Sequence, residues 1–145
     1  MMSHHTYQIT LKPISFFLPS EEVNTNDVQR LAAKIRGNGI WTTPLPVDGA
    51  TGLVMDGNHR LRAAAMLNLA YLPCVLLNYQ NPGLMVLDWQ TGMPFDIEHI
   101  YRVVVHGKKV LPYKTTRHLF SPALPGTALS LDELRAPVLE SAEAC

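Results

Sequence analysis

The sequence predicts an α+β fold, in which a small mixed sheet is flanked by short helices. Two patterns predict this class: short apolar segments of strand type alternate along the chain with segments whose apolar residues recur at helical spacing. The composition agrees, because 47% of the 145 residues are hydrophobic and 17% are charged, a balance that can bury one core. We therefore expect one domain over residues 1–120, followed by a Pro-rich C-terminal tail over residues 121–145 that can form one short helix.

The first predicted elements are strand segments followed by a helix. β-branched and aromatic residues predict one or two short strands over residues 7–17, interrupted by Pro13, and a loop over residues 18–22. Apolar residues then recur at helical spacing from Asn26, the expected N-cap, as far as Gly37.

The middle of the chain predicts a strand, a glycine turn and a second helix. Residues 45–47 and 53–55 are short apolar segments around an Asp-Gly turn, which indicates a hairpin or two neighbouring strands. The second segment runs directly into Asp-Gly-Asn-His-Arg at residues 56–60. An Ala-rich helix follows and stops near Asn68.

The later elements are a strand, a helix and a polar loop. Residues 72–79 form a strand of buried type, and a short apolar segment ends at Trp89. Asp96 can cap a helix that ends near Gly107. Residues 115–118 are expected in a basic polar loop.

Charge and cysteine usage exclude several classes. Twelve Lys+Arg balance twelve Asp+Glu, so a nucleic-acid partner is not expected. Cys74 and Cys145 have neither metal-site nor disulfide spacing, and reduced thiols indicate a cytoplasmic protein. No apolar stretch approaches the roughly 20 residues of a membrane helix, and residues 1–8 lack the pattern of a signal peptide. We expect no membrane partner.

The turn at residues 56–60 has the composition of a phosphate site. A glycine turn between a strand and a helix presents backbone N–H groups at the positive end of the helix dipole, which suits an anion. Asp56 could hold Mg²⁺, and Arg60 adds a fixed positive charge. A simple capped helix start, with Asp56 bonded to backbone donors, is an equal alternative.

Three further groups are candidates for a site. Two hydroxyls, a guanidinium and an imidazole at residues 115–118, next to Lys114, suit a carboxylate or a phosphate, although a solvated loop is the commoner outcome. Glu21 and Glu22 could supply a general base, although paired glutamates before a helix are usually solvated. Trp41 and Trp89 could line a pocket, although buried tryptophans are more often core residues.

The order of these segments resembles the ParB/sulfiredoxin superfamily. A helix, a strand, Val-Met-Asp-Gly-Asn-His-Arg at residues 54–60, an Ala-rich helix and Leu-Pro-Cys-Val at residues 72–75 follow one another as in that superfamily. Within it, residues 18–23 and 111–118 resemble the free L-serine kinases, which phosphorylate the amino acid itself to O-phospho-L-serine. The resemblance extends over residues 18–120 and implies a ParB/sulfiredoxin-like fold.

The resemblance implies a small-molecule kinase that uses ATP or ADP and Mg²⁺, with free L-serine or a similar hydroxy amino acid as the acceptor. Glu21 matches the glutamate that takes the proton from the serine hydroxyl, with Glu22 as the fallback, and Asp56 matches the aspartate associated with Mg²⁺ and the reacting groups. The other matches are the phosphate-binding residues Gly57, Asn58, His59 and Arg60, and the residues that enclose the amino acid, Trp89, Thr115, Thr116, Arg117 and His118.

The chain departs from the serine-kinase pattern at three places. Ser20 and Asn58 stand where these kinases usually carry histidines. Only residues 90–114 separate the tryptophan from the Thr-Thr-Arg-His segment, where the kinases carry a further segment. The part that encloses the nucleotide would then be missing or supplied by a second subunit, which allows a homodimer.

Two alternatives stay open. The Asp-Gly-x-His-Arg turn also fits a ParB-like nucleotide-binding or DNA-associated regulatory module, although the neutral charge and the lack of a helix-turn-helix pattern after the core count against DNA binding. The other is a domain that binds an anionic metabolite without catalysis. Sulfiredoxin activity is not expected, because that family uses a cysteine where this chain has Asn58.

Overall fold

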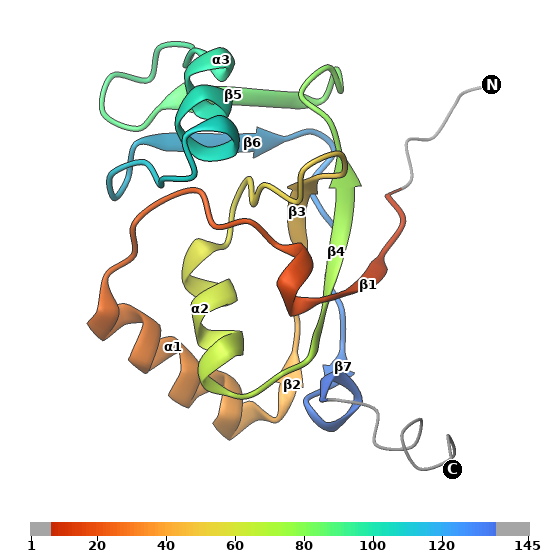
Figure 1. Cartoon of the computed structure of the whole chain (residues 1–145). Helices are drawn as coiled ribbons and strands as arrows, with labels where there is room; N and C mark the ends of the chain where they lie inside the picture. The colour runs from red at the N-terminus through yellow and green to blue at the C-terminus, as the bar shows by residue number, and fades with distance from the viewer. Residues whose placement is uncertain (1–6, 136–145) are drawn as a thin grey trace, which may run out of the picture.

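The computed structural model describes residues 7–135, which form a three-stranded sheet and two two-stranded ribbons together with helices (Figure 1). The strands are β1 (Thr10–Pro13), β2 (Ile40–Trp41), β3 (Leu45–Asp48), β4 (Tyr71–Leu77), β5 (Leu84–Asp88), β6 (Thr116–Phe120) and β7 (Leu129–Ser130). The helices are α1 (Thr25–Asn38), α2 (Asn58–Met66) and α3 (Ile97–Ile100), and a π-helical segment, Tyr101–His106, continues α3. Single 3₁₀ turns lie at Ile14–Phe16 and Asp132–Leu134.

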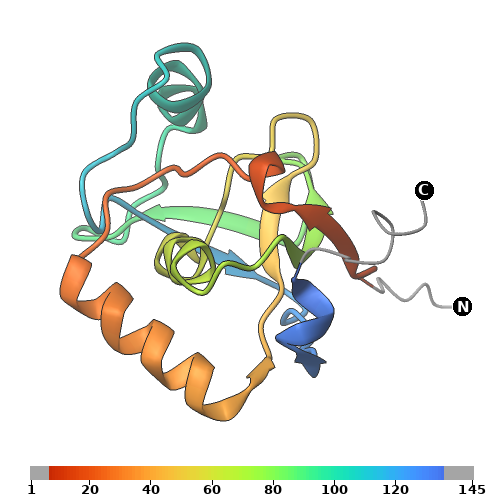
Figure 2. The same cartoon turned by 60° about the horizontal axis from the view of Figure 1, so that its bottom comes forward.

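The central sheet has the strand order β1-β4-β3, with β1 antiparallel and β3 parallel to β4. This confirms the mixed sheet that the sequence predicts. The parallel pair follows from the chain path, because a helix, α2, connects β3 to β4 and lets both strands run in the same direction. α1 and α2 pack beside each other on one side of the sheet (Figures 1 and 2). β3 is buried along its whole length, as expected of a covered strand.

The main core lies between the central sheet and these two helices. Trp41 is 1% exposed and its indole N–H donates to the carbonyl oxygen of Thr43 at 2.6 Å, so it is a core residue. Leu131 and Leu134, from the segment assigned to the Pro-rich tail, are buried in the same core, and β7 pairs with β2. Each fully buried leucine stabilises the fold by about 2 kcal/mol.

A second core lies under the antiparallel ribbon β5-β6, which α3 and the π-helical segment cover (Figure 1). The predicted helix is confirmed: the Asp96 carboxylate caps it by accepting the N–H of Glu98 at 3.0 Å. The buried members of this core are Leu53, Val86, Ile100, Val104 and Leu111.

Residues 17–22, which follow the first 3₁₀ turn, connect two halves of the molecule. One half contains the main core, and the other contains the core under the ribbon β5-β6. On one side, Leu18 exchanges backbone hydrogen bonds with residues 52–54, at 2.8 and 3.0 Å. On the other side, Leu111 donates to the carbonyl oxygen of Ser20 and accepts from the N–H of Glu22, both at 2.8 Å. Figure 1 shows this red-orange stretch between the ribbon β5-β6 and the helices below it.

A buried carboxylate also connects the halves. Asp48, at the end of β3, is 1% exposed and accepts hydrogen bonds from the hydroxyls of Tyr101 and Thr51, both at 2.8 Å. Burial, and then the bond to Asp48, raise the pKa of Tyr101 to about 12, so this phenol stays a donor at neutral pH.

The expected start of the first helix is wrong by two residues. Asn24, and not Asn26, is the N-cap of α1, and its side chain accepts the N–H of Asp27 at 3.0 Å. Both positions carry a capping residue type, and the path of the chain from Glu22 decides between them. The helix ends at Gly39, which has φ 71°.

Two other expectations are corrected. Residues 53–55 do not form a regular strand: Leu53 bridges Leu18 in parallel and Val54 bridges Val47 in antiparallel orientation, so neighbouring residues pair with different partners. Residues 116–118 lie in β6 and not in a loop, because their backbone pairs with residues 86–88 of β5. Such long-range pairing overrides the weak strand propensity of polar residues.

The remaining expectations concern cysteines and membranes. Cys74 is a free, buried thiol in β4, and burial raises its pKa to about 11, so it stays protonated. Cys145 lies outside the described residues, as do residues 136–144 of the tail. Within residues 7–135, no helix combines the length and the apolar character needed to cross a membrane.

Gly52 tests the joint between the halves. Its φ is 80°, and a Cβ would collide with the carbonyl oxygen of Phe16, so Gly52→Ala should lower the free energy of unfolding by about 2–4 kcal/mol. Gly37→Ala is the matched control: it lies in α1 with nothing within 4 Å of a Cβ, and it should stabilise the protein by about 0.5–1 kcal/mol. Urea unfolding measures both. Equal effects of the two substitutions would contradict the packing at Gly52.

Candidate functional site

A cavity of about 480 Å³ lies where the N-terminal end of α2, the Glu21 loop and the start of β6 meet. It brings together residues more than 90 positions apart in the chain, and all of the candidate site residues line it except Trp41 and Thr115. The lining residues are Glu21, Glu22, Met55, Asp56, Gly57, Asn58, His59, Arg60, Trp89, Tyr113, Lys114, Thr116, Arg117, His118 and Leu119.

The glycine turn opens the N-terminal end of α2 toward the cavity. Gly57 is the N-cap, with φ 103°, and a Cβ there would collide with the Leu45 side chain, so the turn requires glycine. The first N–H groups of an α-helix have no partner within the helix, and the helix dipole is positive there. This end of α2 can therefore bind an anion.

Asp56 is an exposed residue that directly precedes the glycine turn and lines the cavity. Desolvation by the surrounding protein raises the pKa of Asp56, against the lowering effects of the Gly57 N–H and of Arg60. The carboxyl group thus lies near the Gly57 N–H and the Arg60 guanidinium, and the residue also lines the cavity.

Asn58 holds the Glu21 loop on the start of α2. Its side-chain oxygen accepts the N–H groups of Ser20 at 2.8 Å and Glu21 at 3.3 Å, and its amide donates to the Ser20 hydroxyl at 3.1 Å. That hydroxyl donates in turn to the carbonyl oxygen of Val54 at 2.6 Å. The two positions where serine kinases usually carry histidines therefore contact each other, and the Asn58 side chain is engaged within the protein.

Thr116 fixes one oxygen of the Glu21 carboxylate. Both the backbone N–H and the hydroxyl of Thr116 donate to Oε2 of Glu21, at 2.8 and 2.7 Å. Within residues 7–135, Oε1 accepts no hydrogen bond, so one oxygen of an oriented carboxylate is available in the cavity.

Thr115 supports the loop from outside the cavity. Its hydroxyl donates to the carbonyl oxygen of Pro112 at 2.6 Å, and its own carbonyl accepts the N–H of Trp89 at 3.0 Å. Of the two threonines, one therefore orients Glu21 and the other closes the loop that precedes β6.

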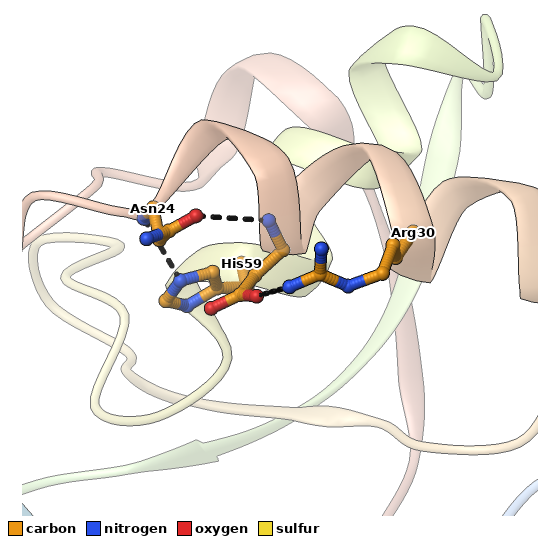
Figure 3. Close-up of polar contacts among 4 residues, drawn as sticks. Asn24, Arg30 and His59 are labelled. Atoms are coloured by element: carbon orange, nitrogen blue, oxygen red, sulfur yellow. Dashed lines mark hydrogen bonds and ion pairs between the residues drawn. The ribbon is translucent and has the colours of Figure 1, made fainter.

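His59 connects the turn to α1, as Figure 3 shows. Its Nε2 accepts the backbone N–H of Asn24 at 3.1 Å, while the Asn24 side chain caps α1. Asp27 and Arg30 form an ion pair one turn further along. Because Nε2 acts as an acceptor, the proton of the neutral ring is on Nδ1. The ring also meets Tyr113 edge-on, with centroids 5.8 Å apart.

Cations gather on the opposite wall. The Lys114 ammonium lies 5.3 Å from the centre of the Trp89 ring, and the Arg117 guanidinium lies 5.5 Å from the same centre. Among residues 7–135, neither of them forms an ion pair, and neither does Arg60. Unpaired cations around a cavity favour an anionic ligand.

His118 is a neutral imidazole in the floor of the site. It is 9% exposed, and its Nε2 lies 2.9 Å from the Tyr79 hydroxyl, while Nδ1 is buried without a partner. Burial lowers the pKa of His118 to about 4. Sequence reasoning did not identify Tyr79, because nothing in the pattern of β4 and its flanking loop links it to residue 118.

The donor set suits Mg²⁺ only in company with a ligand. The ion is usually held by one or two carboxylates together with phosphate oxygens and water, and Asp56, which lines the cavity, fits this role. Within residues 7–135, no cluster of three or more His, Cys, Asp or Glu residues could hold a metal ion alone.

Solved structures of other proteins share the fold of this chain. A free serine kinase in complex with AMP superposes with a TM-score of 0.77 over 88% of this chain and 94% of that chain, at 14% sequence identity. The chain has a ParB/sulfiredoxin-like fold. This confirms the α+β class and the fold that the resemblance implied.

Sequence comparison matches proteins of two kinds. An ATP-dependent L-serine kinase of Staphylothermus marinus is 30% identical over 76 residues, which are 50% of this chain and 30% of that protein. A ParB-like protein of Sulfolobus acidocaldarius is 27% identical over 77 residues, which are 50% of this chain and 39% of that protein. The matches thus span about a third of the length of these relatives. No family model matches the chain.

Asn58 can be tested through stability. Asn58→Ala leaves the buried N–H of Ser20 and the half-buried N–H of Glu21 without this acceptor and should lower the free energy of unfolding by about 2 kcal/mol. Asn58→Asp keeps the acceptor and should recover part of the loss. Asn26→Ala, on the exposed side of α1, should stay within about 0.5 kcal/mol of the wild type in the same urea titrations. An Asn58→Ala variant as stable as the wild type would show that Asn58 does not hold the Glu21 loop on the start of α2.

His118 should make the fold sensitive to acid. Because its folded pKa of about 4 lies below the ordinary value of 6.5, the unfolded chain binds a proton that the folded chain does not, and stability is lost as the pH falls from 6.5 toward 4. Between pH 7 and pH 5 this contributes a loss of about 2 kcal/mol. Urea unfolding at both pH values should show a smaller loss in His118→Gln, but an unchanged loss in the surface control His106→Gln. An equal loss in all three proteins would contradict this.

Proposed function

We propose that this protein is a kinase for a free hydroxy amino acid, which transfers the terminal phosphoryl group of ATP or ADP to L-serine or a similar acceptor. The observation that supports this most directly is the Glu21 carboxylate, held at one oxygen by Thr116 and free at the other, in the same cavity as the N-terminal end of α2. Phosphoryl transfer needs chiefly positioned phosphates, compensating charge and an oriented nucleophile, and the cavity offers groups for each.

Glu21 is the proposed general base. The acceptor hydroxyl attacks the terminal phosphorus, the bond from that phosphorus to the bridging oxygen breaks, and the hydroxyl proton passes to the free Oε1 of Glu21. The nucleotide leaves with one phosphate fewer. Thr116 acts through Glu21 as a positioning residue, because both of its donors are engaged by the carboxylate.

The nucleotide phosphates are assigned to the start of α2. The free N–H groups after Gly57 and the Arg60 guanidinium face them, and Asp56 would hold Mg²⁺, which supplies further charge compensation for the phosphates when bound. The Asn58 side chain is engaged by the Glu21 loop, so its contribution to the phosphates is through its backbone.

The amino acid is assigned to the wall formed by Trp89, Arg117 and His118. A guanidinium can bind a carboxylate with two parallel hydrogen bonds, which suits Arg117 for the acceptor carboxylate. The imidazole of His118, with Nε2 at the Tyr79 hydroxyl and Nδ1 buried, supports this wall from within the protein, and the indole of Trp89 adds an apolar contact. Thr115 supports this wall through the loop that it closes.

Glu21→Gln is the decisive variant. Purified protein is incubated with ATP or ADP, Mg²⁺ and a panel of L-serine, L-homoserine and L-threonine, and the phosphorylated product is read by mass spectrometry. Glu21→Gln should lower kcat at least about 100-fold, because it removes the base, while the affinity for AMP stays within about twofold. Glu22→Gln, one residue along and lining the same cavity, should keep most of the activity.

The outcomes separate the alternatives. Loss of activity in Glu22→Gln but not in Glu21→Gln would transfer the role of base to Glu22. Absence of any phosphorylated amino acid with the wild type, beside a competent control enzyme, would refute the kinase. Preferential binding of CTP together with salt-sensitive DNA binding would then favour a ParB-like regulatory module, in line with the likeness to the Sulfolobus acidocaldarius protein.

A further inference from the structure

We propose that Lys114 is an oxyanion-binding residue of this cavity, whose ammonium group contacts a carboxylate or phosphate of the bound ligands. This role deepens the proposed function and rests on it. Three independent observations point to it: the backbone conformation of Lys114, the aromatic rings beside its ammonium group, and the lack of an ion pair to Lys114 within residues 7–135.

The backbone of Lys114 is in the left-handed region, with φ 58°. Residues other than glycine, asparagine and aspartate rarely adopt this conformation, because Cβ crowds the backbone. The turn is closed by the Thr115 hydroxyl on the carbonyl oxygen of Pro112, and glycine or asparagine would fit it with less strain. A strained residue at the wall of a cavity indicates that its side chain is needed there.

Two aromatic rings hold the side chain at the cavity. The ammonium nitrogen lies 5.3 Å from the centre of the Trp89 ring and 5.4 Å from that of Tyr113. Such contacts attract the cation and restrict its position without neutralising its charge. The two rings come from the two ends of the segment that connects β5 to β6, since Trp89 directly follows β5 and Tyr113 precedes β6.

Lys114 forms no ion pair within residues 7–135, although Glu21, Glu22 and Asp56 line the same cavity. Arg117 lies over the same Trp89 ring at 5.5 Å. Two cations on one indole repel each other, and an oxyanion between or beside them removes this repulsion. The two cations beside Trp89 therefore favour the binding of an anionic ligand.

Lys108 provides an internal comparison. It also has a left-handed backbone, with φ 56°, and it is exposed, but it follows the π-helical segment and does not line the cavity. Its conformation is that of a residue that ends a helix. The two lysines share the same backbone strain and differ in their surroundings.

The experiment replaces each lysine by asparagine, which tolerates the left-handed backbone and removes the charge. Calorimetric binding of AMP measures the phosphate, and calorimetric binding of L-serine measures the carboxylate. Lys114→Asn should weaken at least one of these affinities by about tenfold or more, as expected for a lost hydrogen bond to a charged group. Its melting temperature should stay equal to or above that of the wild type. Lys108→Asn should leave both affinities unchanged, and Lys114→Arg should retain most of the binding.

The two calorimetric measurements identify the anionic group that Lys114 contacts. A loss confined to AMP assigns Lys114 to the phosphates, and a loss confined to L-serine assigns it to the carboxylate. Unchanged affinity for both ligands in Lys114→Asn overturns the role of Lys114 even if the wild type is an active kinase. A wild type that binds AMP or L-serine without turnover overturns the kinase and leaves the binding test of Lys114 decisive. A wild type that binds neither ligand overturns both.

Discussion

Hydrogen bonds hold residues 20–22 between the two halves of the molecule, and the rest of the structure depends on these bonds. Asn58 accepts the N–H groups of Ser20 and Glu21 on one side, and Leu111 and Thr116 form hydrogen bonds with residues 20–22 on the other. Each of these buried or half-buried polar groups would cost about 1–3 kcal/mol if left unpaired. The start of α2, the loop and the start of β6 are therefore placed together. The same bonds bring Glu21 to the positive end of α2, so one set of contacts supports both the fold and the candidate site.

Charge is distributed unevenly in this neutral protein. Twelve basic and twelve acidic residues cancel over the sequence, but Arg60, Lys114 and Arg117 meet at one cavity without ion pairs in the described part of the chain. Two buried titratable groups do not add to this field in the same way. Burial keeps His118 neutral, and the Asp48 carboxylate accepts hydrogen bonds from two hydroxyls. Local electrostatics thus favour an anion at one place, which net charge alone does not reveal.

Local patterns predicted much of the fold. Helical spacing predicted α1 and α2, the glycine turn marked the start of α2, and Asp96 marked the cap of α3. Apart from the N-cap of α1, the errors came from long-range pairing. Residues 116–118 carry polar side chains with no strand pattern, and they form β6 only because β5 lies beside them. Residues 53–55 look like a strand but pair with two different segments, so no ladder forms.

The sequence by itself determined which chemical groups the site contains, because a glycine turn before a helix, a carboxylate pair and a basic Thr-Thr-Arg-His segment are recognisable within a few residues of chain. Tertiary structure alone decided what each group can do. Thr116 orients Glu21 whereas its neighbour Thr115 closes a loop, Asn58 is engaged by Ser20, and His118 is neutral. Hydrogen-bond partners and desolvation decide these differences, and both depend on residues that are distant in the chain and adjacent only after folding.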